Sequence, residues 1–192
     1  MANGNSSSLV SEFDPIFYSQ AKKGNLFIYH VASQALLLSA TTGGHPTVFN
    51  PMGSGKDFIP LALRISFISG TTVIGAVILA ETLDAGSAPA TASPILTGTY
   101  VAPKNAYRGG GAAKTSKMLW YPTTNTFTAA PTAIHATGLN LGAAAPTGTG
   151  TYECKFDGGL IFAPGTAMSV CYTVTTSTAL FQISILGLER DV

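Results

Sequence analysis

Charged residues are scarce in this chain, at 10% of its 192 residues against about 25% in an average soluble domain. The net charge is +1 and no lysine or arginine run occurs, so the sequence lacks the basic patch that binds nucleic acid or an acidic membrane surface. Hydrophobic residues still make up 46%, which excludes a disordered chain and predicts a single domain with a core. The low charge predicts a surface of small polar residues, or one covered by other protein.

Cysteine is also rare, and its positions carry no metal-binding pattern. Cys154 and Cys171 have neither the Cys-x-x-Cys nor the Cys/His spacing of a zinc site, and two cysteines are too few for a disulfide framework. Two buried thiols are the favoured interpretation, and a disulfide between neighbouring strands is the alternative. The N-terminal stretch MANGNSSS lacks the segments of a secretory signal, so export by that route is not expected.

Catalytic and metal-binding motifs are missing as well. His30, His45 and His135 are scattered, and no serine, cysteine or carboxylate stands at the spacing of a catalytic triad. Glu153 and Asp157 alternate with apolar neighbours, which places them on the solvent side of a strand. We therefore expect a protein without enzymatic activity, cofactor or metal.

The stretch Gly53-Ser54-Gly55-Lys56 is superficially similar to a phosphate-binding loop. The motif G-x-x-x-x-G-K-[S/T] requires a first glycine and, after the lysine, a hydroxyl that holds magnesium. Asn50 and Asp57 occupy these two positions, and the carboxylate of Asp57 would repel phosphate. The stretch is instead predicted to form a tight turn between two strands.

Alternating apolar and polar residues predict an all-β fold with short strands and turns of glycine and proline. In 58–68 the alternation points Arg64 away from the core, and in 179–188 it places Phe181, Ile183 and Ile185 on one face. Further strands are expected near 26–31, 35–39, 46–50, 72–81, 117–121, 133–139, 151–156, 159–163 and 168–175.

The apolar run 61–80 has about the length of a membrane span, but it contains Arg64 and the interruption Ser-Gly-Thr-Thr at 69–72. Its many β-branched residues favour two strands. The second of these, 72–81, is apolar on both faces. It is expected either in the centre of a sheet or at a contact between subunits, and Val77 and Ile78 are the candidate self-association residues.

An N-terminal arm, residues 1–24, is predicted ahead of a sandwich domain of residues 25–192. Asp14 and Pro15 suit a helix start, and Gly24 suits a left-handed stop. The short helix either packs on its own domain or reaches a partner. Four apolar side chains of the arm are the candidate partner contacts: Phe13, Ile16, Phe17 and Tyr18.

Two stretches rich in alanine, proline, threonine and glycine, 84–98 and 128–150, are predicted to be long surface loops at the ends of the sandwich. Trp120 and Tyr121 form the main aromatic cluster outside the arm. Packing in the core is the expected role of Trp120, and an exposed sugar-binding face is the alternative.

Two segments resemble small virion proteins of tailed bacteriophages. The first is 45–56, HPTVFNPMGSGK, followed by a long alternating strand, and the second is 159–170, GLIFAPGTAMSV, followed by a closing strand that ends in Leu186-Gly187-Leu188-Glu189. The resemblance covers 45–80 and 158–190. It is to capsid decoration, or cement, proteins with a jelly-roll-like sandwich.

This resemblance implies an antiparallel β-sandwich of jelly-roll type and a non-enzymatic role on the outer capsid surface. Such a protein bridges major capsid subunits and stabilises the shell, often as a dimer or trimer. It needs no cofactor, and neither nucleic acid nor membrane is an expected partner. The alternative function is a tail-fibre or receptor-binding module whose end loops, 84–98 and 122–150, bind carbohydrate.

Overall fold

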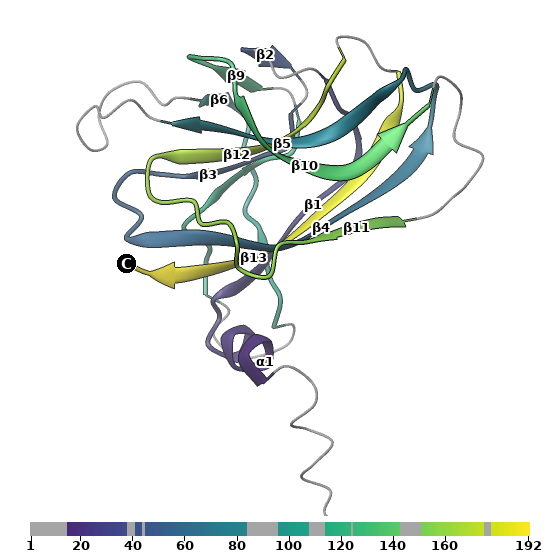
Figure 1. Cartoon of the computed structure of the whole chain (residues 1–192). Helices are drawn as coiled ribbons and strands as arrows, with labels where there is room; N and C mark the ends of the chain where they lie inside the picture. Colours follow the sequence, from purple (N-terminus) through teal and green to yellow (C-terminus); the bar gives the residue numbers. More distant parts are fainter. Residues whose placement is uncertain are drawn as a thin grey trace, which may run out of the picture.

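The computed structural model describes residues 15–37, 41–43, 45–83, 96–107, 114–123, 125–142, 151–174 and 178–192. Within these ranges the chain forms one helix, α1 (Pro15–Lys22), and thirteen strands (Figure 1). The eight longer strands are β1 (Leu26–Ala35), β3 (Thr47–Asn50), β4 (Lys56–Ser69), β5 (Gly75–Leu83), β10 (Thr132–Leu141), β11 (Thr151–Lys155), β12 (Thr166–Tyr172) and β13 (Leu180–Asp191). The short strands are β2 (Thr42–Gly43), β6 (Leu96–Gly98), β7 (Lys104–Asn105), β8 (Leu119–Tyr121) and β9 (Asn125–Phe127).

Two five-stranded antiparallel sheets face each other. The lower sheet in Figure 1 has the strand order β11-β4-β13-β1-β7, and the upper sheet has the order β10-β5-β12-β3-β8. The eight longer strands pair in a nested order: β1 with β13, β3 with β12, β4 with β11, and β5 with β10. The all-β prediction is therefore confirmed, and the two facing sheets fit the predicted sandwich.

The core lies between the two sheets and follows the alternation along each strand. In β13, Phe181, Ile183 and Ile185 are buried in it, while Gln182 on the opposite face is exposed. Burial of each such apolar side chain stabilises the fold by about 1.5–3 kcal/mol. Arg64 of β4 points to solvent, as predicted.

The apolar run 61–80 forms most of β4, a loop, and the first part of β5 rather than one continuous segment. Both strands lie within sheets, with β4 between β11 and β13 and β5 between β10 and β12. The two-strand interpretation is confirmed. In the described parts of the chain, no helix has the length and apolar character needed to cross a membrane.

A third, small sheet of order β2-β9-β6 lies on the outside of the upper sheet (Figure 1). Phe127 of β9 packs with Phe49, Tyr121 and Ala167 in a second apolar cluster. Beside this cluster, Asn125 Nδ2 donates to the backbone oxygen of His45 at 2.6 Å. The small sheet therefore shields the outer face of β3, β8 and β12 from solvent.

Several expected boundaries differ from the observed ones. Residues 159–163 form no regular strand, and only Phe162 makes an isolated bridge, to Phe58. The reason is local, because Asp157 and Gly158 both have positive φ, at 47° and 76°, and turn the chain away after β11. Of the strand predicted at 35–39, Ala35 is the last residue of β1, residues 36–37 form no strand, and 38–39 lie outside the described residues.

The predicted loop stretches lie partly outside the described residues. In 84–98 the described part is β6, so these three residues form a strand where a loop was predicted. The stretch 128–150 is interrupted by β10, which occupies 132–141 and agrees with the strand expected near 133–139. A threonine- and alanine-rich sequence can form such a strand because it borders the sheet and needs one paired side only.

Candidate functional site

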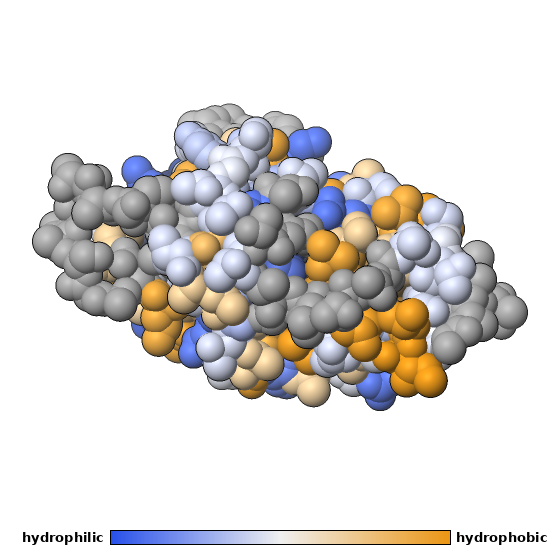
Figure 2. Space-filling model, turned by 90° about the horizontal axis from the view of Figure 1, so that it is seen from above, coloured by the Kyte–Doolittle hydropathy of each residue, from blue (hydrophilic) through white to orange (hydrophobic). Residues whose placement is uncertain are grey.

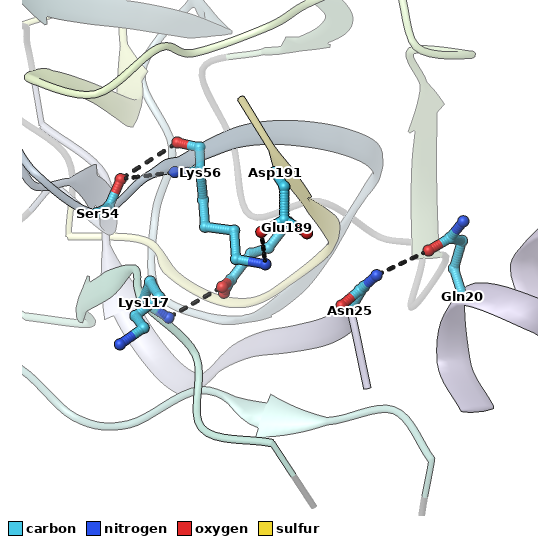
Figure 3. Close-up of polar contacts among 7 residues, drawn as sticks. All are labelled: Gln20, Asn25, Ser54, Lys56, Lys117, Glu189 and Asp191. Carbon is cyan, nitrogen blue, oxygen red and sulfur yellow. Dashed lines mark hydrogen bonds and ion pairs between the residues drawn. The ribbon is translucent and has the colours of Figure 1, made fainter. Parts of the chain in front are cut away.

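Helix α1 is joined to β1 by a glycine cap. The amide of Asn25 donates to the oxygen of Gln20 and the amide of Gly24 to that of Ala21, each at 3.0 Å, with Gly24 at a φ of 75°. This is a Schellman motif, and it confirms the left-handed stop predicted at Gly24. Asn25 Nδ2 also donates to Gln20 Oε1 at 3.0 Å (Figure 3). The end of the helix is thereby fixed to the start of β1.

The described part of the arm lies on its own domain, below the lower sheet in Figure 1. Ala21 packs against Leu26, Ile59 and Leu61, an apolar cluster separate from the central core. The structure describes one of the first two candidate partner contacts of the arm. Ile16 belongs to α1, and Phe13 lies outside the described residues.

Two aromatic side chains of α1 reach solvent. Phe17 is 36% exposed and Tyr18 is 59% exposed. The ammonium of Lys22 lies 4.6 Å from the centre of the Tyr18 ring. The hydrogen bond to Tyr18 and the charge interaction with it raise the pKa of Lys22. The helix therefore presents two aromatic rings and a cation to solvent.

A buried carboxylate, Glu189 of β13, lies close to the helix end of the sandwich and is 2% exposed. Tyr29 Oη donates to Glu189 Oε1 at 3.1 Å, and Ser116 Oγ donates to the same oxygen. The backbone amide of Lys117 donates to Oε2 at 2.9 Å (Figure 3). Burial, followed by the nearby negative charge of Glu189, raises the pKa of Tyr29 well above its usual value. Three donors thus compensate the desolvated carboxylate.

Glu189 also fixes the segment 114–118 to β13. Met118 of this segment is buried, and its amide donates to Ser116 Oγ at 3.0 Å. A Cβ atom added to Gly24 would lie 3.0 Å from Lys114 Cγ, so the stem of Lys114 lies against the helix cap. These contacts therefore hold together the end of α1, the segment 114–118 and β13.

Two adjoining hollows, with volumes of about 630 and 310 Å³, open among these elements and share Asn25 and Lys114. We call them together the basic groove. Five cationic side chains line it, half of the ten in the chain: Lys23, Lys56, Lys114, Lys117 and Arg190.

Among the described residues, those of the groove lining that are acidic are Glu189 and Asp191, which leaves this lining a surplus of three positive charges. The whole chain carries +1, so the rest of it has a surplus of two negative charges. Lys56 Nζ lies 2.6 Å from Asp191 Oδ1 (Figure 3). The side chain of Lys56 is only 16% exposed. The hydrogen bond and charge of Lys56 lower the pKa of Asp191.

Four cations of the basic groove have no acidic partner among the described residues. The ion pairs in these parts of the chain are Lys56 with Asp191 and Arg64 with Glu153. The four exposed cations without such a pair are Lys23, Lys114, Lys117 and Arg190. The groove is therefore electrostatically open to an anionic group.

Sequence reasoning missed Glu189 as a functional residue, although a signal was present. Along β13 the inward positions continue from Ile185 through Gly187 to Glu189, since side chains alternate at every second residue. An acidic residue at an inward position must find donors. Tyr29 and Ser116, which supply them, lie far from Glu189 in the sequence.

The self-association residues lie within the upper sheet. Val77 is fully buried in the core, and Ile78 lies half-buried on the opposite face of β5. The exposed apolar residues of the segment 72–81 precede β5: Val73 is 36% and Ile74 is 74% exposed. Figure 2 shows hydrophobic residues reaching the surface mainly along one long side of the molecule. A charge at Val77 would consequently report on folding, and self-association stays a prediction.

Both cysteines are free thiols near a histidine, and neither arrangement favours a thiolate. Cys154 Sγ lies 3.9 Å from His135 Nε2, and Cys171 Sγ lies 3.6 Å from His45 Nδ1. Burial raises the pKa of the Cys154 thiol, and raises that of Cys171 to about 12. The disulfide alternative is wrong, whereas burial is complete for Cys171 and partial for Cys154.

We expect one of the two thiols to react with an aromatic disulfide reagent at pH 8 in the native protein. A thiol with a pKa of about 12 is ionised at that pH to about one part in ten thousand. The absorbance of the released thiolate should correspond to one equivalent, and to two after denaturation. Cys154→Ser should abolish the native reaction, and two native equivalents would contradict the burial of Cys171.

The other motifs discussed from the sequence have structural roles. The stretch 51–55 forms the predicted turn between β3 and β4, with Ser54 N donating to Pro51 O at 3.0 Å. Trp120 is 1% exposed in the core, so the sugar-binding alternative for this side chain is excluded. Glu153 lies opposite Arg64 on β11, with a shortest distance of 3.5 Å between the two charged groups.

No protein-family model, curated protein or solved structure matches this chain. The resemblance of 45–80 and 158–190 to phage decoration proteins therefore stays a prediction. The features that bear on function are the exposed aromatic face of α1, the basic groove beside it and the topology of the sandwich.

Proposed function

We propose that this protein is a non-enzymatic virion structural protein, a decoration or cement protein of a tailed bacteriophage. It binds the outer capsid surface and stabilises the shell by bridging subunits of the major capsid protein. It acts as a dimer or trimer. Binding energy in such an assembly comes from surface area buried repeatedly by symmetry, and it requires no reactive side chain.

The strand topology supports a jelly-roll sandwich. A jelly roll is one long antiparallel hairpin of eight strands wrapped into two sheets, so the first strand pairs with the last and the second with the seventh. The pairs β1 with β13, β3 with β12, β4 with β11 and β5 with β10 follow this scheme. Jelly rolls are common in viral capsid proteins and also occur in lectins.

The observation that carries the proposal is the outward aromatic face of α1. The helix is attached through Ala21 and the cap at Gly24, and this attachment leaves Phe17 and Tyr18 exposed. Aromatic side chains bury large areas and are enriched at the centres of protein interfaces. A helix rigidly held on the sandwich avoids part of the ordering cost of binding.

Replacing both Phe17 and Tyr18 by serine should weaken binding to particles that lack this protein. Loss of two interface aromatics is expected to cost about 2–4 kcal/mol, so the dissociation constant should rise at least about thirtyfold. Cosedimentation of the purified variant with such particles measures this. The variant should keep its far-ultraviolet dichroism, because neither side chain is part of the core.

Ile68→Ser provides the matched control, since Ile68 is 47% exposed and lies near the end of β4 that is remote from α1. It should leave particle binding unchanged. Particles without the protein should still attach to host cells but release their contents at lower temperature. Normal particle stability together with lost attachment would instead establish the receptor-binding alternative and overturn the proposal.

A further inference from the structure

We propose that the basic groove binds an acidic polypeptide segment, with Lys114, Lys117 and Arg190 as the main contacts. The inference rests on the proposed function only for the identity of the protein that carries the segment. The groove itself is defined by its lining and by the buried Glu189 that holds it together.

The first argument is the segregation of charge. A chain with so few charged residues places half of its cations around one groove, while the rest of the chain has a negative surplus. Mutual repulsion among these cations disfavours the arrangement in the free protein. An anionic ligand offsets that repulsion, whereas a neutral or cationic ligand does not.

The second argument is that the groove is preorganised. Lys117 is held through its backbone amide by the buried carboxylate of Glu189, and Lys114 packs its stem on the Gly24 cap. Arg190 follows Glu189 in β13, where its backbone lies opposite Asp57 of β4 in the strand register. The backbones that carry the cations are thus fixed, although the charged ends reach solvent. Less conformational entropy is lost when a ligand binds such a site.

The mixed lining favours a polypeptide over a phosphate polymer. Glu189 and Asp191 lie among the cations, and the amide groups of Gln20 and Asn25 add donors and acceptors. A nucleic acid presents a dense row of phosphates, which the two carboxylates would repel and which four free cations cannot neutralise. A peptide with spaced carboxylates can contact the cations, and its backbone amides can contact the acidic and amide groups.

The helix end of the sandwich would therefore contact its partner in two ways. The aromatic face of α1 supplies apolar area, and the basic groove at the end of the same helix supplies charge complementarity. Exposed charges of this kind contribute mainly to the association rate and to specificity. Binding through the groove should consequently weaken as salt is added.

A hexaglutamate peptide is the probe for this proposal, titrated into the purified full-length chain by isothermal calorimetry and by nitrogen-proton NMR. At 20 mM salt we expect binding and chemical-shift changes at the amides of Lys117 and Arg190. Replacing Lys114 and Lys117 together by glutamine should raise the dissociation constant about three- to tenfold, as expected for two exposed charge contacts. Raising the salt to 300 mM should weaken wild-type binding, because the screening length falls below 10 Å.

Lys155→Gln is the matched control, because Lys155 is exposed on β11 and does not line the groove. It removes one positive charge from the chain and should leave the affinity within about twofold. Equal weakening by this control would show general attraction to the chain and would overturn the proposal. Absence of hexaglutamate binding at low salt would also overturn it.

A duplex DNA of 12 base pairs serves as the competing ligand. Tighter binding of DNA than of hexaglutamate, weakened by the same double substitution, would assign the groove to a phosphate polymer and overturn the peptide proposal. These titrations contain no virus particles. Their failure would leave the particle-binding test of Phe17 and Tyr18 intact, and failure of that test would leave the peptide result intact.

Discussion

Replacing Trp120 by alanine should lower the free energy of unfolding by about 3–5 kcal/mol, the range for large aromatic truncations in a core. Its indole ring is buried and makes a T-shaped contact with the ring of Tyr29, with ring centres 6.0 Å apart and planes at 75°. Its Nε1 donates to the backbone oxygen of His30 at 3.1 Å. The substitution removes these contacts and leaves a cavity, and urea unfolding followed by circular dichroism measures the loss.

Trp120→Phe separates the contribution of ring volume from that of the hydrogen bond. Phenylalanine keeps most of the apolar contacts but leaves the oxygen of His30 without the indole donor, so a smaller loss of about 1–3 kcal/mol is expected. Tyr100→Ala, at a 56% exposed ring, should change stability by less than either core substitution. A loss below 1 kcal/mol for Trp120→Ala would contradict the assignment of this side chain to the core.

Gly187→Ala should destabilise the protein by about 1–3 kcal/mol through overpacking. A Cβ atom at this position of β13 would lie 2.2 Å from Phe58 Cε2 and 3.1 Å from Tyr29 Cε2. The Phe58 ring cannot easily withdraw, because it packs on Tyr29 with ring centres 5.3 Å apart. Glycine is thus required for the close approach of two aromatic rings to the strand.

Gly142→Ala is the control for this substitution. No atom lies within 4 Å of a Cβ added at Gly142, so the change in stability should stay within about 0.5 kcal/mol. Thermal unfolding of both variants under one set of conditions provides the comparison. Equal effects at the two positions would show that contact with Phe58 does not decide the cost at Gly187.

The helix end of the molecule combines the features on which the two proposals depend. Phe17 and Tyr18 lie on α1, while Lys114 and Lys117 are held beside its cap by Glu189. Gly187 lies two residues before Glu189 on the same strand, facing the same aromatic ring of Tyr29. Packing in the core and the geometry of the basic groove are therefore linked through β13.

The sequence by itself determined the strands and the helix cap. In 58–68 and 179–188 the alternation of apolar and polar residues is nearly complete, and β4 and β13 cover these ranges within a few residues. The stop at Gly24 could be predicted because a left-handed residue after a helix favours glycine over side chains with a Cβ. Both signals are local, since neighbouring residues create them.

Only the tertiary structure decided which strands pair and what lies at the helix end. The first and last long strands, β1 and β13, are neighbours through contacts between residues that are far apart in the chain. The role of Glu189 depends on Tyr29 and Ser116, and the basic groove draws its cations from α1's end, β4, segment 114–118 and β13. Periodicity determines the face of a strand on which a side chain lies. Which other side chains it contacts on that face depends on how the sheets pack across the whole fold.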